Sequence, residues 1–360
     1  AEQLPGRNSS RSSHRPVDQP IRKEKGGKMK KLSIILAIML SLVSFAFVGC
    51  KKNDSSVIRV NEVTHSIFYA PFYVAINKGY FKDEGITIEL TNGGGSNNSM
   101  TALITNGADV ALLGPETAVY TYAQGAKDQP VIFGQLTKRD GSFMFTRDTN
   151  ENFSWNNVVG KEILAGRRGG MPYMALEYLL KQKGLLDKTN LNTDVAFANM
   201  ASAYQGGQGD YTTLFEPTAS DMASNGLGKI VASIGAEVGE VPYTAFMATK
   251  SFMEKNPKTI KAFLRAVWKG YNFLVNAPIE DVADALSPSF DGTSKQNIQA
   301  AITTYKSIDA WVSNPAMTKD SYNRLCAIMT SAGELSVSVP MEAIVDNSYA
   351  NEVMRELLDM

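Results

Sequence analysis

Glycine-rich loops that follow apolar segments are the first feature of the sequence that could do chemistry. The stretch TNGGGSNNSM, residues 91–100, offers Gly94, Gly95, Ser96 and Asn97 just before a helix-like segment. Backbone N–H groups at a helix start bind anions or the polar edge of a small molecule. A P-loop would also need a Lys, and a dinucleotide loop would need glycines spaced as GxGxxG. The stretch has neither, so we exclude both nucleotide loops.

Two further loops have the same character. One contains Gly114, Pro115 and Glu116, and the other contains Gly169, Gly170, Met171 and Pro172. A lone loop of this kind can also be a simple tight turn. Because ligands of open α/β sheets bind beyond the carboxyl ends of the strands, three such loops favour a shared cleft.

Catalysis has little support in the sequence. Downstream of residue 49 the only histidine is His65, and neither GxSxG nor HExxH occurs, so a Ser/His/Asp site or a His-rich metal site is not expected. Glu116 and Glu216 could act as acid and base, but no second catalytic element accompanies them. We therefore expect no enzyme activity, no metal and no cofactor. His65 itself is either a ligand contact or a structural, hydrogen-bonded side chain.

Aromatic residues cluster in FYAPFY, residues 68–73. Phe68 and Tyr69 precede Pro71 at a strand-to-helix turn and are candidates for stacking on a flat ligand, whereas we expect Phe72 in the core. Glu216 lies between an apolar strand and a proline, where a charged side chain needs a partner or water. It is therefore a candidate ligand contact or hinge contact.

The elements that must position these residues alternate between strand and helix. We predict a strand at 57–60, a helix at 70–85, a strand at 86–90, a helix at 99–107, a strand at 109–114, a helix at 115–125 and a strand at 130–136. The order restarts with a strand at 161–166, a helix at 173–184 and strands at 193–198 and 210–215. This alternation is typical of parallel α/β sheets and predicts two lobes.

The rest of the chain is expected to join and cover the lobes. Segments 137–152 and 230–249 are interpreted as paired crossings, and the chain from residue 251 onward is mainly helical, with apolar residues at three and four spacing in 259–275. We assign 57–148 and 239–360 to the first lobe and its helical cover, and 149–238 to the second lobe.

The N-terminal region has the pattern of an export signal. Met29-Lys30-Lys31 precede an uncharged run that ends in Val48-Gly49-Cys50, typical of a secretory signal. The 17 residues 32–48 could alternatively anchor the chain in a membrane. The ending resembles the lipobox of bacterial lipoproteins, which implies a lipidated Cys50. We expect residues 1–28 to be a disordered upstream extension, 29–49 the signal and 50–56 a linker.

Charge and cysteine content restrict the partners. Without residues 1–49 the chain keeps 27 Lys and Arg against 33 Asp and Glu, so no basic stripe suits a nucleic-acid backbone. With Cys50 lipidated, Cys326 has no partner and is expected to be a small core hydrophobe.

Taken in order, several segments resemble a known family. They are VTHSIFYAPFYVAINKGYFKDEGITIEL, TALITNGADVALLGPE, GKEILAGRRGGMP, GDYTTLFEPTAS and VPYTAFMATKSF. They are similar to the solute-binding proteins of ABC importers in the nitrate/sulfonate/taurine and thiamine-pyrimidine-precursor group. The resemblance implies an α/β, two-lobed periplasmic-binding-protein fold of type II. It also implies a monomer on the outer face of the cytoplasmic membrane, with a permease and an ATPase as partners and no nucleic acid.

The resemblance also implies a set of pocket positions: His65, Tyr69, Gly94, Gly95, Gly114, Pro115, Glu116, Gly169, Gly170, Met171, Pro172, Glu216 and Tyr243. Ser96 and Asn97 are added as specificity candidates.

The chemistry of the solute stays open between two classes. Binders of the pyrimidine precursor usually carry a Trp-x-Pro-Asn turn, which NEVTHSIFYAP lacks. Glycine loops and helix N-termini suit a sulfonate or carboxylate oxygen, whereas Glu116 and Glu216 suit an amino or amidine edge. We expect a heteroaromatic or amine-bearing solute, with a sulfonate or nitrate as the alternative. An extracytoplasmic enzyme or a sensor domain is a further alternative.

Overall fold

The computed structural model describes residues 56–358. The predicted upstream extension, the signal, Cys50 and the linker up to residue 55 lie outside the described residues, as do residues 359–360. Of the helices within the described range, none has the length and apolarity that a bilayer crossing requires.

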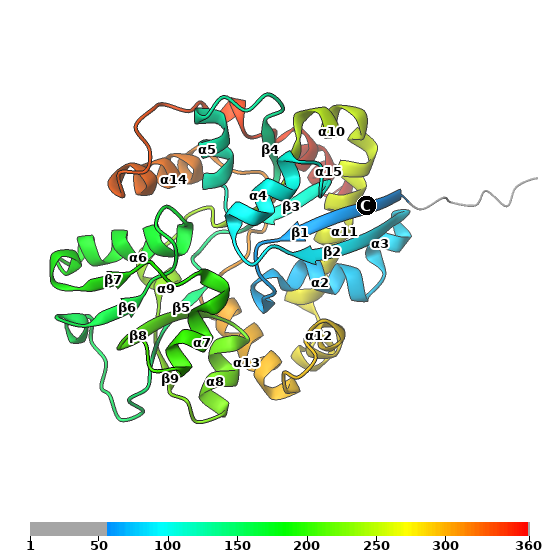
Figure 1. Ribbon diagram of the computed structural model, residues 1–360. Coiled ribbons are helices and arrows are strands. Elements are labelled where there is room, and N and C mark those ends of the chain that lie inside the picture. The colour runs from blue at the N-terminus through cyan, green and yellow to red at the C-terminus, as the bar shows by residue number, and fades with distance from the viewer. Residues whose placement is uncertain (1–55, 359–360) are drawn as a thin grey trace, which may run out of the picture. The chain divides into compact units, whose positions relative to one another are not determined.

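Five strands form the sheet of the first lobe, in the order β2-β1-β3-β10-β4 (Figure 1). β1 pairs in parallel with β2 and β3, whereas β10 runs antiparallel to β3 and β4. The bounds are β1 Ser56–Glu62, β2 Ile86–Asn92, β3 Val110–Leu113, β4 Pro130–Thr137 and β10 Thr244–Thr249. β3 and β4 are buried along their whole length, because helices cover both faces of such a sheet.

The second lobe repeats this arrangement with the order β7-β6-β8-β5-β9 (Figure 1). β6 is parallel to β7 and β8, and β5 is antiparallel to β8 and β9. The bounds are β5 Ser142–Thr146, β6 Glu162–Leu164, β7 Asn190–Asn192, β8 Tyr211–Phe215 and β9 Lys229–Ser233. The prediction of a two-lobed α/β fold of type II is therefore confirmed.

Helices follow most strands, and the chain ends in a run of them. Their bounds are α2 Ala70–Asn77, α3 Tyr80–Asp83, α4 Ser96–Ile104, α5 Glu116–Ala123, α6 Met171–Gln182, α7 Met200–Gln205, α8 Thr218–Ser224, α9 Ile234–Val238, α10 Lys250–Lys255, α11 Pro257–Asn276, α12 Ile279–Leu286, α13 Lys295–Ser307, α14 Lys319–Ser331 and α15 Ser348–Leu358. The single helix predicted at 70–85 is split, because Gly79 adopts a left-handed φ of 78° between α2 and α3.

The strand predicted at 193–198 is wrong. The strand of this region is β7, which ends at Asn192, and it is followed by a loop and by the 3-10 turn Phe197–Asn199. The alternating apolar residues Val195 and Phe197 line a cavity instead of pairing in the sheet. Alternating apolar and polar residues indicate a segment that is buried on one side only. A loop that faces a cleft is buried in the same way, so it can show the same alternation as a strand.

The first crossing lies earlier than the boundary predicted at residue 148. β4 ends in the first sheet at Thr137 and β5 begins in the second sheet at Ser142. β5 lies within the segment 137–152 that was interpreted as a crossing, and it belongs to the second lobe. The return crossing occupies residues 234–243 and contains α9. The two crossings are bonded together, since Val241 N–H donates to the Lys138 carbonyl at 2.9 Å.

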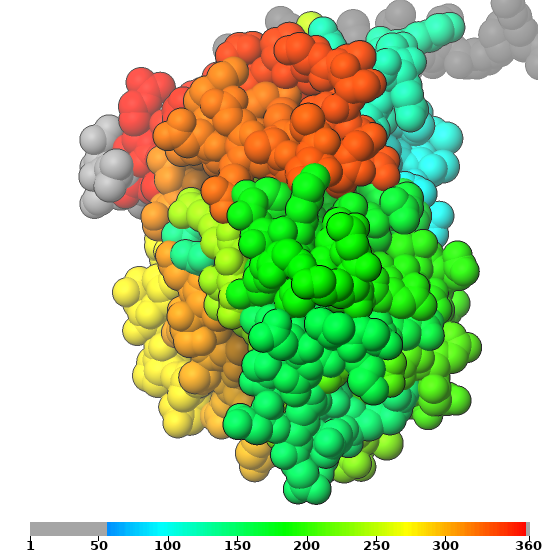
Figure 2. Space-filling view, turned by 90° about the vertical axis from the view of Figure 1, so that its left-hand side faces the viewer, coloured from blue at the N-terminus to red at the C-terminus, as the bar shows by residue number. Residues whose placement is uncertain are grey.

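The helical cover was predicted to belong to the first lobe, but it packs on both lobes. α11 packs against α2, α3 and α15, whereas α13 packs against α8 and α14 against α6 of the second lobe. The Lys181 ammonium of α6 donates to the Ser331 carbonyl of α14 at 3.2 Å. In Figure 2 the orange segment that contains α14 lies on the green segment of the second lobe.

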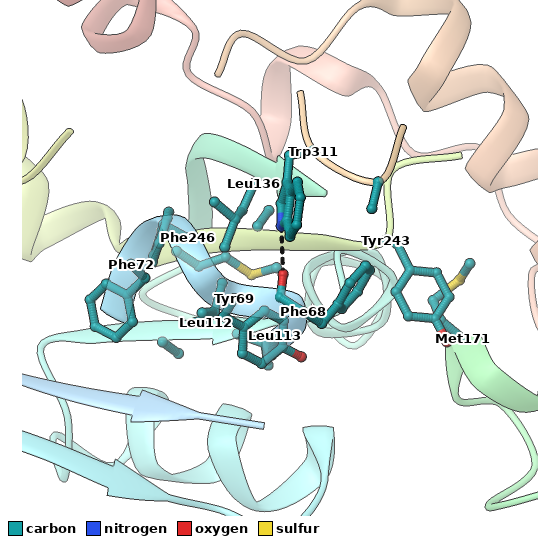
Figure 3. Packing of buried hydrophobic residues seen from close by; sticks show 14 of the residues in the cluster. Phe68, Tyr69, Phe72, Leu112, Leu113, Leu136, Met171, Tyr243, Phe246 and Trp311 are labelled. Atoms are coloured by element: carbon teal, nitrogen blue, oxygen red, sulfur yellow. Dashed lines mark hydrogen bonds between the residues drawn. The ribbon is translucent and has the colours of Figure 1, made fainter. Parts of the chain in front are cut away.

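A continuous aromatic core connects the first sheet with the crossings. The Phe68 ring lies 5.0 Å from Tyr305 and 5.8 Å from Tyr243, between ring centroids. The Trp311 indole N–H donates to the Phe68 carbonyl at 2.8 Å, the dashed bond in Figure 3. Phe68, predicted as a stacking candidate, is therefore fully buried and holds the turn before α2 in place.

The close approach of the crossings makes Gly235 of α9 sensitive to substitution. A Cβ at this position would lie 2.1 Å from the Asp140 carbonyl oxygen, so the backbone would have to move. We expect Gly235→Ala to lower the free energy of unfolding by about 1–3 kcal/mol, as overpacking does, measured by urea denaturation. Gly206→Ala is the matched control, because its nearest atoms lie at 3.4 Å. An unchanged Gly235→Ala variant would contradict this packing.

Candidate functional site

A cavity of about 350 Å³ lies where loops of both lobes meet. From the first lobe it is lined by Val63 and Thr64 after β1, residues 94–98 after β2, and Gly114 and Glu116 after β3. The second lobe contributes Gly166, Arg167 and residues 170–172 after β6, residues 193–197 after β7, and Phe215 at the end of β8. All of these positions are at carboxyl ends of strands, where α/β folds bind their ligands.

Most of the predicted pocket residues meet at this cavity. Its lining includes Tyr69, Gly94, Gly95, Ser96, Asn97, Gly114, Glu116, Gly170, Met171, Pro172 and Tyr243. His65, Pro115, Gly169 and Glu216 are absent from the lining. That the lining residues contact a solute stays a prediction, whereas their convergence is a property of the fold.

His65 has a structural position outside the cavity. Its Nδ1 lies 2.7 Å from Glu62 Oε1 and its Nε2 lies 2.5 Å from the Ser289 carbonyl oxygen. A carboxylate and a carbonyl only accept hydrogen bonds, so this pair of partners stabilises the imidazolium form of the ring. The bond to Glu62 raises the pKa of His65 accordingly. Of the two readings of His65, its partners favour the structural one.

Glu216 is buried beside the crossings. Its carboxylate accepts from Ser220 N at 2.9 Å and from Ser220 Oγ at 2.7 Å. Its carbonyl accepts from Ser66 Oγ at 2.5 Å and from Ile67 N at 3.2 Å, which joins the second lobe to the turn after β1. Glu216 thus satisfies its polar atoms within the protein, in agreement with the hinge alternative.

Glu116 differs from Glu216 because its buried carboxylate has no partner. The side chain is 0% exposed, and within residues 56–358 neither carboxylate oxygen has a partner at full hydrogen-bond geometry, although the backbone N–H groups of Glu116 and Met171 lie close enough to act on its pKa. Burial raises the pKa of Glu116 to about 7, against smaller opposing effects of the Arg167 charge and the backbone N–H groups of Glu116 and Met171. A buried polar group without a partner is costly, so the Glu116 carboxyl group and the Tyr243 hydroxyl, which also lacks a partner, are the lining groups that a polar solute could satisfy.

Gly114 makes room for this carboxyl group. A Cβ on Gly114 would lie 2.0 Å from Glu116 Oε2 and 2.5 Å from Oε1. The carboxyl group therefore folds back over the glycine, two residues before it. This explains the glycine in the Gly-Pro-Glu sequence without any need for a special backbone angle.

Aromatic rings form another wall of the cavity. Phe215 lies 5.4 Å from Phe197 and 6.2 Å from Tyr243, between ring centroids. Figure 3 shows Tyr243 next to Met171, the first residue of α6. Phe197 and the other lining residues of 193–197 were missed at the sequence level because their alternation was assigned to a strand. Their polar neighbours Thr193 and Asp194 were the available signal for a loop.

The glycine loop before α4 is held by its own side chains. Asn92 Oδ1 accepts from Gly94 N–H at 2.7 Å, and Asn98 Nδ2 donates to the Gly93 carbonyl at 2.7 Å. Neither α4 nor α6 has a side-chain cap at its N-terminus. Their first N–H groups are therefore not satisfied by a capping side chain and can serve a polar ligand atom.

Within residues 56–358 no three His, Cys, Asp or Glu side chains gather as a metal site would require.

Two lobes that share one cavity, lined by loops at strand ends, are the arrangement found in the class of solute-binding proteins.

Comparison with known proteins gives the family. The family described as "NMT1/THI5 like" matches residues 67–281. The "Putative binding protein YtlA" of Bacillus subtilis is 40% identical over 315 residues, covering 87% of this chain and 94% of that protein. The chain belongs to the NMT1/THI5-like family and has the two-lobed fold of solute-binding proteins.

A more distant relative and two solved structures extend the comparison. A "4-amino-5-hydroxymethyl-2-methylpyrimidine phosphate synthase" of Aspergillus parasiticus is 24% identical over 224 residues, covering 59% of this chain and 64% of that protein. The ligand-binding component of an ABC-type import system from Staphylococcus aureus has a TM-score of 0.63 at 14% identity and covers 83% of this chain and 99% of its own. The alkanesulfonate-binding protein SsuA of Xanthomonas axonopodis has a TM-score of 0.65 at 14% identity and covers 81% and 99%. These structures share the fold.

The buried carboxylate should make stability depend on pH. In the unfolded chain Glu116 ionises near its ordinary pKa of 4.5, whereas the folded chain keeps the proton up to about pH 7. The folded state therefore binds more protons between these values and loses stability as the pH rises.

Relative to Glu116→Gln, the ligand-free wild type should lose about 3 kcal/mol between pH 4.5 and pH 7, from the size of the pKa difference. Above pH 7 the difference should stay constant. Urea denaturation of both chains across this range measures it. Glu89→Gln, at an exposed position of β2, is the control and should show no such slope. A flat wild-type curve relative to Glu116→Gln would show that the carboxyl group has a partner.

Proposed function

We propose that this protein is the extracytoplasmic solute-binding component of an ABC importer. In this proposal the two lobes close on a small, nitrogen-bearing heteroaromatic solute of pyrimidine-like structure, and the loaded protein delivers it to a permease driven by an ATPase. The observation that carries the choice of solute is the buried carboxyl group of Glu116, which lines the cavity without a partner.

A carboxyl group in this state suits an aminopyrimidine edge. An ionised carboxylate accepts two hydrogen bonds, and a protonated one donates one and accepts another. An exocyclic amino group next to a ring nitrogen offers a donor beside an acceptor, so it matches the protonated carboxyl group that Glu116 keeps up to about pH 7, and it matches the ionised form only when the ring nitrogen itself carries the proton. Phe215, Phe197 and Tyr243 supply apolar ring surface for a flat molecule. The family relative named for an aminopyrimidine phosphate supports the same chemistry.

A sulfonate or nitrate is the alternative solute. It is favoured by the uncapped starts of α4 and α6 and by Arg167 in the cavity lining. SsuA, the alkanesulfonate-binding protein of the same fold, was solved with MOPS. Above its pKa of about 7, however, Glu116 would place a like charge beside an oxyanion, which raises the cost of binding such a solute.

Binding assays separate the two classes of solute. We expect 4-amino-5-hydroxymethyl-2-methylpyrimidine to raise the melting temperature, because a ligand of the folded state alone stabilises it, and MOPS and nitrate to leave it unchanged. Glu116→Gln should weaken binding of this pyrimidine by about 10- to 100-fold in calorimetric titration, the loss typical of a hydrogen bond to a charged group.

Glu89→Gln is the matched control and should bind as the wild type does. Stabilisation by MOPS or nitrate but not by the pyrimidine would establish the oxyanion alternative. Conversion of the bound pyrimidine to another compound would establish the enzyme alternative.

The membrane association in this proposal depends on Cys50, which lies outside the described residues. We infer that Cys50 is lipidated, becomes the mature N-terminus and holds a monomer at the outer face of the cytoplasmic membrane. Two acyl signals or more are needed for stable anchoring, as a lipoprotein N-terminus supplies. This places the protein next to its permease.

Metabolic labelling with a palmitate analogue tests the anchor. Cys50→Ser should abolish the label and release the protein from the membrane fraction. Cys326→Ser should keep both, because Cys326 belongs to α14. Label that persists in Cys50→Ser would contradict the lipid anchor.

A further inference from the structure

Helix α5 connects the cavity to the opposite lobe. Its first residue is Glu116, and Tyr120 follows four positions later, so the two side chains share one face of the helix. Glu116 lines the cavity, whereas Tyr120 is absent from the lining. Tyr120 is half-buried and belongs to the first lobe.

The Tyr120 hydroxyl reaches across the cleft. It donates to the Gly169 carbonyl at 2.9 Å and lies 3.7 Å from the Met174 sulfur. Gly169 precedes α6 and Met174 is within it, so both contacts are with the second lobe. The Tyr120 side chain therefore forms a direct hydrogen bond between the lobes, next to the N-terminus of α6.

Gly169 is shaped to receive this hydroxyl. Its φ is 76°, a left-handed value that favours glycine. A Cβ there would lie 3.4 Å from the Tyr120 hydroxyl and 3.1 Å from Glu334 Oε2. A side chain at this position would therefore be strained and crowded against the residues that meet at the contact.

A second contact closes the other side of the cleft. A Cβ built on Gly94, in the loop before α4, would lie 3.6 Å from the Ala198 Cβ of the second lobe. The lobes therefore approach each other closely on the α4 side and are hydrogen-bonded on the α5 side of the cavity, which is the arrangement of a closed cleft.

We propose that Tyr120 is a positioning residue that holds the lobes closed over the solute without touching it. The bond from its hydroxyl to Gly169 joins the lobes and is broken when they separate, so it favours the closed state and slows solute release. Bonds within one lobe do not shift this balance, since they persist in both states. The proposal depends on the solute-binding class and not on the pyrimidine.

Disulfide trapping measures closure without any solute. The parent variant is the full chain with Cys50→Ser and Cys326→Ser, which removes the native thiols. Gly94→Cys and Ala198→Cys are added to it, because their Cβ separation of 3.6 Å suits a disulfide. With oxidised glutathione as oxidant, adding Tyr120→Phe should slow cross-linking about two- to tenfold, the effect of one lost hydrogen bond. Tyr122→Phe on the same helix, 38% exposed, should leave the rate unchanged.

Hydrogen–deuterium exchange provides a second readout without cysteines at the left-handed Gly94. In the solute-free full chain, Tyr120→Phe should speed exchange in peptides covering 116–123 and 169–176, and Tyr122→Phe should not. Equal rates in Tyr120→Phe and the parent, by both methods, would overturn the proposal. So would failure of the parent pair to cross-link, because the lobe contact itself would then be absent.

Discussion

The burial of one carboxyl group without a partner is the constraint on which the site depends. Desolvation of a carboxylate costs several kcal/mol unless hydrogen bonds or a counter-charge compensate for it. Glu116 avoids this cost by keeping its proton up to about pH 7. Its carboxyl group fits in this position because Gly114, beneath it, has no side chain. Glu216, equally buried, is satisfied by Ser220. The contrast explains why one glutamate faces the cavity and the other holds the crossing.

The crossings and the aromatic core are the second constraint. They connect two lobes that must be able to move relative to each other as rigid units. Among residues 56–358, the segments 138–141 and 234–243 lead directly from a strand of one sheet to a strand of the other. They are packed tightly, since Gly235 approaches the Asp140 carbonyl and the Tyr305 hydroxyl donates to the Gly141 carbonyl at 3.0 Å. Closure is then decided at the far side of the cleft, where Tyr120 and the Gly94 loop meet the second lobe.

Several polar residues near the cavity serve the loops and not the solute. The Tyr73 hydroxyl donates to Glu62, Glu62 bonds to His65, and His65 in turn bonds to the Ser289 carbonyl. This series of hydrogen bonds holds the end of β1 in place. Val63 and Thr64, which follow β1, belong to the cavity lining. A polar residue after a strand therefore indicates the right region of the molecule without indicating whether it contacts solute.

The local pattern of the sequence by itself determined the strand-and-helix alternation, the two lobes and the three glycine loops. Local propensity and apolar periodicity act over a few residues, and most of the predicted elements depend on nothing else. The same reasoning identified nine of the cavity-lining residues in the three loops, because strand ends in an α/β fold converge whatever the side chains are. Tyr69 was a stacking candidate from the aromatic cluster, and Tyr243 was implied by the family resemblance alone.

Only the tertiary structure decided which polar side chains are left without partners. His65, Glu116 and Glu216 look alike in the sequence, and their roles follow from residues far along the chain, such as Ser289 and Tyr305. The 193–197 loop and the strand β5 were misassigned for the same reason, since pairing partners and lobe membership are set by long-range contacts. Alternating apolar residues show that one side of a segment is buried, but they do not show whether a sheet or a cavity lies on that side. Only the folded chain distinguishes the two.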